Sequence, residues 1–260
     1  MDTHLVFYVD MLGVRSLIKS QDIVRIEGLQ NLLHDIALLR GPFELIDDRT
    51  DPIITRPEIS TFSDHIVISY RIGGEGLVTD IVSGAFAAGR LIAELAATAF
   101  PLGLMIRGGA TLGQLHHRDG VVLGEALVEA YELESQLANY PRVLLSKSLY
   151  SQLKEGMDWD FLLTDLDGLP HLNYFRWFCT YGEENGKIFV RWLDEVLTPV
   201  TENIQKLEAA RSVKEVAKWV WFKNTVDQFI SVAEKLFQGV SLVPGQKLAM
   251  RRHSKPRNER

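Results

Sequence analysis

The stretch "STFSDHIVISY", residues 60–70, carries an aspartate between two strand-forming segments in a pattern typical of a hairpin. "IITRPEISTF" (53–62) precedes Ser63-Asp64 and "HIVISYRI" (65–72) follows it, and both are rich in residues that favour strands. Two such segments joined by a tight turn predict an antiparallel pair. A lone aspartate at a turn is usually a turn former, so the chemistry of Asp64 depends on what the fold brings beside it.

The elements around this hairpin predict a ferredoxin-like fold of the α/β (α+β) class. "HLVFYVD" (4–10) has the composition of a buried strand, and apolar residues recur at helical spacing over residues 14–40. After the hairpin we expect a helix from Asp80 to about Phe100, and then a glycine-interrupted strand, "LGLMIRGGATLGQLHH" (102–117). The resulting β-α-β-β-α-β order is that of the ferredoxin-like unit.

Shorter elements follow this unit. "GEALVEAYELESQLA" (124–138) indicates a further helix, and "RVLLS", "KSLYSQL" and "FLLTDLDGLPHLNYF" indicate a short strand, a short helix and a terminal hairpin. A long stretch over about 198–238 has helical spacing with several aromatic residues. We therefore expect a first domain over 1–175, a mostly helical extension over 176–245 and a flexible basic tail over 246–260.

Composition narrows the class of protein. The chain has 260 residues, and its net charge of −6 argues against nucleic acid as the main partner, because phosphate binding needs a basic face. A single cysteine, Cys179, excludes an internal disulfide and a cysteine-rich metal site. The most apolar stretch (86–100) carries Arg90 and Glu94, and the N-terminus lacks the pattern of a secretory signal. We expect a cytoplasmic protein that does not span a membrane.

Two aspartates are predicted to meet in this fold. The first and third strands of the unit are central and adjacent, so Asp10 at the end of one lies beside Asp64 at the start of the other. Two neighbouring carboxylates are costly unless a proton or a cation lies between them. Mg²⁺ and Mn²⁺ take carboxylate and carbonyl oxygens together with substrate phosphates, and two such ions can activate an oxygen nucleophile and neutralise pyrophosphate. The loop "MLGVRS" (11–16) leads into a helix, and its N–H groups and Arg15 can bind phosphate.

These motifs resemble the class III nucleotidyl cyclases. "FYVDMLGVRSL" (7–17), "FSDHIVIS" (62–69), "IRGGATLG" (106–113) and "GEALVEAYELES" (124–135) carry the resemblance, which covers roughly residues 4–170. The more specific resemblance is to stand-alone bacterial pyrimidine cyclases of the Pycsar anti-phage type, which also have a helical C-terminal extension. It implies cyclisation of a nucleoside triphosphate by a homodimer with active sites at the subunit interface. The product would activate a cyclic-nucleotide-responsive effector.

The resemblance also implies a set of site residues. Two Mn²⁺ or Mg²⁺ ions per site would be held by Asp10, Asp64 and the backbone carbonyl of Met11. The nucleotide-binding positions that it implies are Leu12, Gly13, Val14, Arg15 and Ser60.

Departures from the family pattern bear on the substrate. Purine cyclases read the base with a lysine at the position of Ser60 and an aspartate at the position of Val121. A hydrogen-bonding pocket rejects the wrong base strongly only when its polar groups are in place, so purines are disfavoured. The resemblance then favours UTP, followed by CTP.

Other departures bear on catalysis. The family asparagine and arginine of the "VNxAxR" segment are replaced by Val128 and Glu132. Loss of such a transition-state donor costs about 10²–10³ in rate, so another cation must replace it. The candidates are Arg107 and Arg142, and Arg107 is favoured because the glycines after it permit close backbone approach. Two alternatives remain: an inactive cyclase-homology module that binds a nucleotide or a partner, and a purine cyclase with a rebuilt base pocket.

Overall fold

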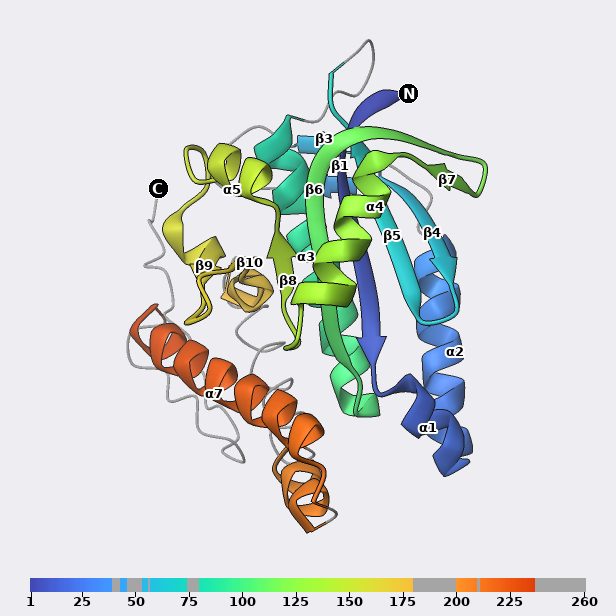
Figure 1. The fold of residues 1–260 in the computed structure, drawn as a ribbon, viewed down its shortest axis with the longest axis vertical. Coiled ribbons are helices and arrows are strands. Elements are labelled where there is room, and N and C mark those ends of the chain that lie inside the picture. The colour runs from blue at the N-terminus through green and yellow to red at the C-terminus, as the bar shows by residue number, and fades with distance from the viewer. Residues whose placement is uncertain are drawn as a thin grey trace, which may run out of the picture.

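One mixed sheet carries the fold in a computed structural model, which describes residues 1–38, 43–45, 53–55, 57–73, 80–179, 200–209 and 211–236 (Figure 1). The strand order is β4-β5-β1-β6-β8-β10-β9, and β7 pairs with β6 outside this path. The core strands are β1 (Asp2–Leu12), β4 (Glu58–Phe62), β5 (His65–Arg71) and β6 (Met105–Arg118). All neighbours among these four are antiparallel, and β1 lies between β5 and β6. This topology confirms the predicted ferredoxin-like unit and its central pair of strands.

The predicted C-terminal elements extend this sheet. β8 (Val143–Leu145) is parallel to β6, and β10 (Pro170–Leu172) and β9 (Leu162–Thr164) continue it. The short helix α5 (Lys147–Leu153) follows β8, as expected. β7 (Val121–Leu123) returns along the end of β6 after a turn at Asp119-Gly120, where both residues have positive φ.

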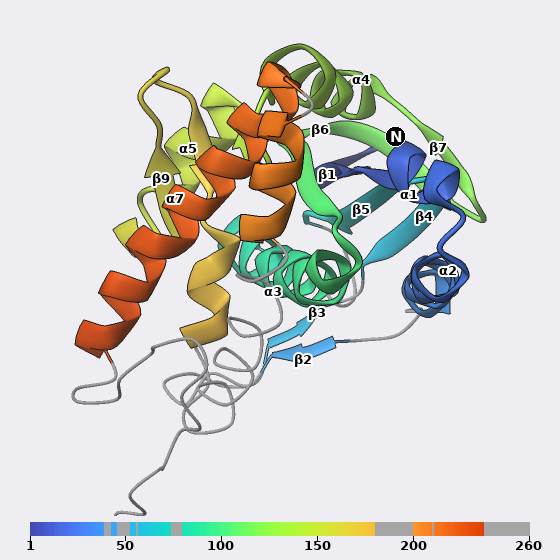
Figure 2. The same cartoon turned by 90° about the horizontal axis from the view of Figure 1, so that it is seen from below.

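Helices cover both faces of the sheet. α2 (Ile23–Leu38) and α3 (Ile81–Ala99) pack with one face in the main apolar core, whereas α4 (Glu125–Glu132) packs on the other (Figure 2). The alternation of β1 explains this division, because successive side chains of a strand point to opposite faces. Leu5, Phe7 and Val9 lie in the main core, while Val6 lies in the smaller cluster under α4.

Two sequence predictions need correction. Residues 14–40 were expected to form one helix, but α1 (Val14–Ser20) ends at Gln21, whose φ of 56° is left-handed and incompatible with a continuing helix. Residues 53–62 were expected to form one strand, but β3 (Ile53–Thr55) pairs with β2 (Phe43–Leu45) in a separate hairpin. Pro57 lies directly before β4, where its missing N–H disfavours a continuous ladder.

The helical extension shares the core of the first domain. Residues 200–209 are helical, and α7 (Val213–Leu236) buries Trp219, Phe222 and Phe229 in the main apolar cluster. Figure 2 shows α7 beside the β8–β9 end of the sheet. The aromatic residues noted in this stretch of sequence thus pack on the core, and the basic tail over 246–260 lies outside the described residues.

One helical segment, Ile81–Leu102, is long and apolar enough to cross a membrane. One face of this segment is nevertheless packed inside the fold, because Ala85, Ala88, Ile92 and Ala96 are completely buried in the main apolar core. The segment therefore acts as the core helix of the domain, in agreement with the sequence expectation.

Candidate metal and nucleotide site

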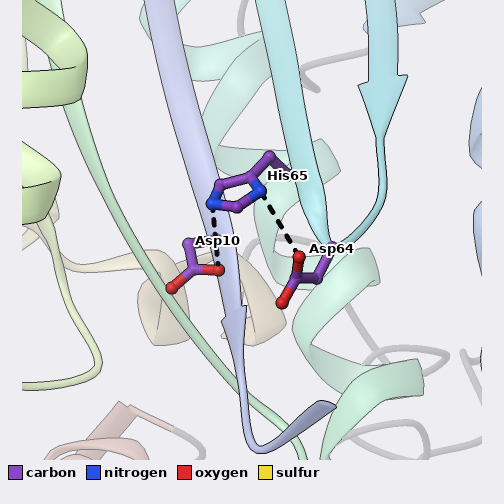
Figure 3. Close-up of side chains that lie close together, drawn as sticks. All are labelled: Asp10, Asp64 and His65. Atoms are coloured by element: carbon purple, nitrogen blue, oxygen red, sulfur yellow. Dashed lines mark ion pairs between the residues drawn. The ribbon is translucent and has the colours of Figure 1, made fainter. Parts of the chain in front are cut away.

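The register of β1 and β5 brings the two predicted aspartates together. Asp10 is paired with His65, the residue directly after Asp64. The Met11 N–H donates to the Asp64 carbonyl oxygen at 3.2 Å, which ties the hairpin turn to the end of β1. Ser63 occupies the first turn position with a left-handed φ of 57°. The expectation that Asp10 and Asp64 lie side by side is confirmed (Figure 3).

A histidine that the sequence reasoning did not single out lies between these carboxylates. His65 Nε2 is 3.6 Å from Asp10 Oδ1, and its Nδ1 is 3.3 Å from Asp64 Oδ1 (Figure 3). One ligand atom from each of the three residues lies within 4.8 Å of the other two. Asp10 is buried, while Asp64 and His65 are half-buried and open to a ligand. Two carboxylates and an imidazole at this spacing fit a divalent cation.

Arg107 completes the charge cluster from the neighbouring strand. It is paired with Asp10 in the β1–β6 register, and its Nε donates to Asp10 Oδ2 at 2.9 Å. Its Nη2 lies 2.6 Å from Glu134 Oε1, and its Nη1 donates to the Ala138 carbonyl at 3.4 Å. Burial raises the pKa of Glu134, and the Arg107 guanidinium opposes that rise. Arg107 is therefore placed beside the predicted metal ligands, as its candidacy requires.

These side chains form a row across the sheet face that α4 partly covers. The paired positions Phe62, His65, Asp10 and Arg107 run across β4, β5, β1 and β6. Directly paired residues of antiparallel strands project to the same face, so the row defines one surface.

The next row along the same face explains the second glycine of the "RGG" segment, Gly109. It consists of Ser60, Val67, Tyr8 and Gly109. A Cβ at Gly109 would collide with the Ala130 carbonyl of α4, so glycine lets the helix approach the strand. Burial, together with the charges of Glu134 and Asp10, raises the pKa of Tyr8 to about 12, which keeps its hydroxyl protonated.

Ser60 belongs to a buried polar network that sequence reasoning missed. Its Oγ is 2.9 Å from His117 Nε2, and Ser69 Oγ is 2.9 Å from His117 Nδ1. Figure 1 shows β6 bending over the end of the sheet. His117, near the end of β6, thereby reaches Ser60 of β4 and Ser69 of β5. Burial lowers the pKa of His117 to about 4, so the ring is neutral at physiological pH. His116 is exposed, as expected for adjacent residues on opposite faces of a strand.

Two buried histidines, His117 of this network and His171 of β10, predict loss of stability in mild acid. Burial lowers the pKa of both His117 and His171 to about 4, whereas the unfolded chain takes up a proton near pH 6.5. The unfolded state therefore binds more protons between these two pH values. The free energy of unfolding decreases as the pH is lowered through that window. Each histidine should cost roughly 2 kcal/mol at about pH 5 relative to neutral pH. Urea unfolding across this range measures the slope, which His117→Gln should reduce and exposed His116→Gln should not; equal slopes would contradict the assignment.

The second candidate arginine, Arg142, forms its ion pairs with carboxylates outside the metal-site cluster. Arg142 is completely buried; its Nη1 donates to Asp165 Oδ2 at 2.8 Å, and its Nη2 pairs with Asp167. The same Asp165 oxygen accepts a hydrogen bond from Trp221 of α7 at 2.7 Å. These contacts give Arg142 a structural role that joins β8, the β9–β10 turn and the extension. Catalysis by Arg142 would require the guanidinium to leave both carboxylates, so the prediction of a catalytic Arg142 is not retained.

The predicted phosphate loop follows β1 directly. Met11 and Val14 bury their side chains, Leu12 is half-buried and Arg15 is exposed. Gly13 has a left-handed φ of 105° at the start of α1 and faces the Gly103 carbonyl, where a Cβ would be crowded. A ligand could therefore meet the backbone of this loop and the Arg15 side chain, but not the side chain of Val14.

Comparisons with known proteins give only distant similarity. No protein-family model matches the chain, and no curated protein matches it. Two solved structures of a bacterial light-regulated adenylyl cyclase are similar to it, with TM-scores of 0.39 and 0.40 and sequence identities of 11% and 13%. Both similarities cover 75% of this chain, which spans 58% and 57% of those longer proteins. The functional proposal rests on the sequence motifs and the geometry of the site.

Proposed function

We propose that this protein is a nucleotidyl cyclase that converts a pyrimidine nucleoside triphosphate, UTP in preference to CTP, into the 3′,5′-cyclic monophosphate and pyrophosphate. The observation that carries the proposal is the convergence of Asp10 and Asp64 at the joined ends of the two central strands. In this reaction the ribose 3′-oxygen bonds to the α-phosphorus, the bond to the β-phosphate oxygen breaks, and the hydroxyl proton passes to solvent. Positioning and charge neutralisation supply most of the catalysis in such transfers.

The metal-binding residues in this proposal are Asp10 and Asp64, with the Met11 carbonyl as a further oxygen donor. Bound Mg²⁺ or Mn²⁺ ions lower the pKa of a coordinated hydroxyl and neutralise phosphate charge. The Asp10 carboxylate is well suited to orient a cation, because Arg107 holds its Oδ2 at 2.9 Å while Oδ1 faces Asp64 and His65.

Arg107 is the proposed cation for the charge that develops on the α-phosphate. Its side chain is 24% exposed, so it can meet a ligand while Asp10 and Glu134 keep it in place. A guanidinium held between two carboxylates needs little reorganisation in the transition state, which is how preorganised donors lower a barrier. Leu12, Gly13, Val14 and Arg15 would bind the remaining phosphates.

Ser60 is the proposed contact with the base. Its hydroxyl lies one row from Asp10 on the same sheet face and is oriented by neutral His117. A serine hydroxyl is shorter than the lysine of the purine pattern and can donate to or accept from a pyrimidine edge. The preference for UTP over CTP rests on the sequence resemblance.

A second copy of the chain would complete the site. Phe62, which is paired with His65, and Tyr131, which packs against Tyr8, expose apolar side chains beside it, and Val128 is exposed on the same helix as Tyr131. This exposure is consistent with the proposed homodimer. In the proposed setting, the cyclic product acts in the cytoplasm as a second messenger that activates an antiviral effector.

Parallel incubations with different nucleotides test both the reaction and its substrate. The full chain is incubated with Mn²⁺ and each of ATP, GTP, UTP and CTP in turn, and the products are separated by chromatography. We expect cyclic UMP as the main product and less cyclic CMP. Cyclic AMP or cyclic GMP as the main product would overturn the pyrimidine assignment in favour of a purine cyclase with a rebuilt pocket.

The second candidate function is an inactive module that binds a nucleotide or a partner. Glu132 favours it, because this exposed acid stands where the family carries its transition-state arginine. Nucleotide binding without any cyclic product in the same incubations would support the module and contradict the cyclase.

A further inference from the structure

We propose that the imidazole of His65 is a third side-chain ligand of the metal site, and that it shifts the preference of the site from Mg²⁺ toward transition-metal ions such as Mn²⁺ and Co²⁺. The inference rests on the proposed function only in taking Asp10 and Asp64 as metal ligands. It concerns which ion the site selects, which the sequence motifs leave open.

The backbone places His65 where a third ligand is needed. It follows Asp64 directly and is paired with Asp10 across the β1–β5 ladder, so its position relative to both carboxylates is set by main-chain hydrogen bonds. Paired residues of adjacent strands have Cβ atoms about 4.5–5.5 Å apart. A modest side-chain adjustment therefore brings one ring nitrogen and both carboxylates onto a common ion.

Packing on a neighbouring ring orients the His65 imidazole, while its nitrogens stay available to bind a metal ion. Tyr8 packs against His65 with ring centroids 5.4 Å apart and planes inclined at 43°. Each ring nitrogen faces one carboxylate, at 3.6 Å and 3.3 Å, and within the described chain neither makes a hydrogen bond of normal length. The side chain is 33% exposed, so it can turn toward an ion without unpacking the core.

The carboxylates of Asp10 and Asp64 alone offer a metal ion few oxygen ligands. Asp10 Oδ2 accepts the Arg107 hydrogen bond at 2.9 Å, which leaves Oδ1 as the oxygen directed at Asp64 and His65. Mg²⁺ prefers an octahedron of oxygen ligands and retains waters, so an imidazole adds little to its binding. Imidazole nitrogen favours first-row transition ions, whose affinity for such sites rises from Mn²⁺ through Co²⁺. His65 therefore strengthens binding of these ions selectively.

The test measures binding of metal alone, without nucleotide, by the full chain. Titration calorimetry gives the affinities for Mg²⁺, Mn²⁺ and Co²⁺, and pulsed electron paramagnetic resonance of the Mn²⁺ complex detects a coordinated imidazole nitrogen. In the wild type we expect the nitrogen signal and weaker binding of Mg²⁺ than of Co²⁺. His65→Gln should lose the signal and reduce Co²⁺ affinity by about ten-fold or more, with Mg²⁺ affinity within about two-fold.

Matched variants make the result decisive. His116→Gln changes an exposed histidine on β6 and should retain the nitrogen signal and all affinities. A wild-type Mn²⁺ complex without the nitrogen signal, or a folded His65→Gln variant with unchanged Co²⁺ affinity, would overturn the inference. A nitrogen signal from a protein that forms no cyclic product would support the inference while contradicting the proposed activity. Metal binding that is insensitive to Asp64→Asn would refute the site itself.

Discussion

Asp64→Asn will reduce cyclic nucleotide formation by on the order of a thousand-fold, because metal ions supply several kcal/mol of charge stabilisation and the amide is a poor ligand for them. The melting temperature should stay nearly unchanged. Asp64 is half-buried, its carboxylate lies 3.3 Å from His65 Nδ1 and close to Asp10, and its tie to β1 is made by the backbone carbonyl. Product formation is measured by chromatography at saturating UTP and Mn²⁺, and folding by thermal denaturation.

Asp119→Asn is the matched control for this variant. It makes the same acid-to-amide change in another tight turn, between β6 and β7, where the residue is exposed and has a φ of 53°. Asparagine tolerates this left-handed conformation, so neither activity nor stability should change. Turnover by Asp64→Asn at the level of Asp119→Asn would show that the carboxylate does not hold a catalytic ion.

Arg142→Ala will destabilise the protein by about 2–5 kcal/mol, chiefly because truncation of a large, completely buried side chain leaves a cavity, while the solvent-accessible Asp165 and Asp167 lose their partner. The guanidinium is completely buried between Asp165 and Asp167, and it packs over the ring of Tyr140 at 5.5 Å. The hydrogen bonds from Arg142 lower the pKa of Asp167, because they stabilise its ionised carboxylate. Urea unfolding followed by circular dichroism measures the loss.

Two variants separate this structural role from a catalytic one. Arg71→Ala removes an exposed arginine that pairs with Asp2, and an exposed pair of this kind contributes only about 0.2–1 kcal/mol. Arg142→Lys keeps the charge but loses the two-pronged contact with both aspartates, so it should be intermediate in stability. An Arg142→Lys protein with full stability but no turnover would restore Arg142 as a catalytic candidate.

The prediction that the two aspartates meet succeeded because it combined local strand and turn signals with the strand order of the ferredoxin-like unit. Alternating or continuous apolar segments mark strands, and the two-residue turn at Ser63-Asp64 sets the hairpin register. The order of elements predicts the order of strands in the sheet. The end of the first strand then lies beside the start of the third, so Asp10 and Asp64 must meet there. Arg107 was favoured for a similar local reason, the glycines after it, and the β1–β6 register pairs it with Asp10.

The predictions that needed correction depended on competing local effects. The apolar spacing of residues 14–40 is continuous across Gln21, so periodicity does not reveal the left-handed residue that separates α1 from α2. The strand pattern of 53–62 likewise continues across Pro57, although the structure assigns its two ends to different sheets. In both cases tertiary packing selected a break that composition alone allowed but did not require.

The amino-acid sequence by itself determined the order of strands and helices, because turn chemistry and side-chain period act between near neighbours. That order, taken with the strand arrangement of the ferredoxin-like unit, was enough to bring Asp10 to Asp64. Only the tertiary structure decided that His65 lies between those carboxylates, that Ser60 meets His117, and that Arg142 is enclosed by Asp165 and Asp167. The last two contacts join segments remote along the chain, and they depend on the bending of β6 and the packing of the β9–β10 turn. Side-chain direction across such distances is set by the whole fold, so no local pattern encodes it.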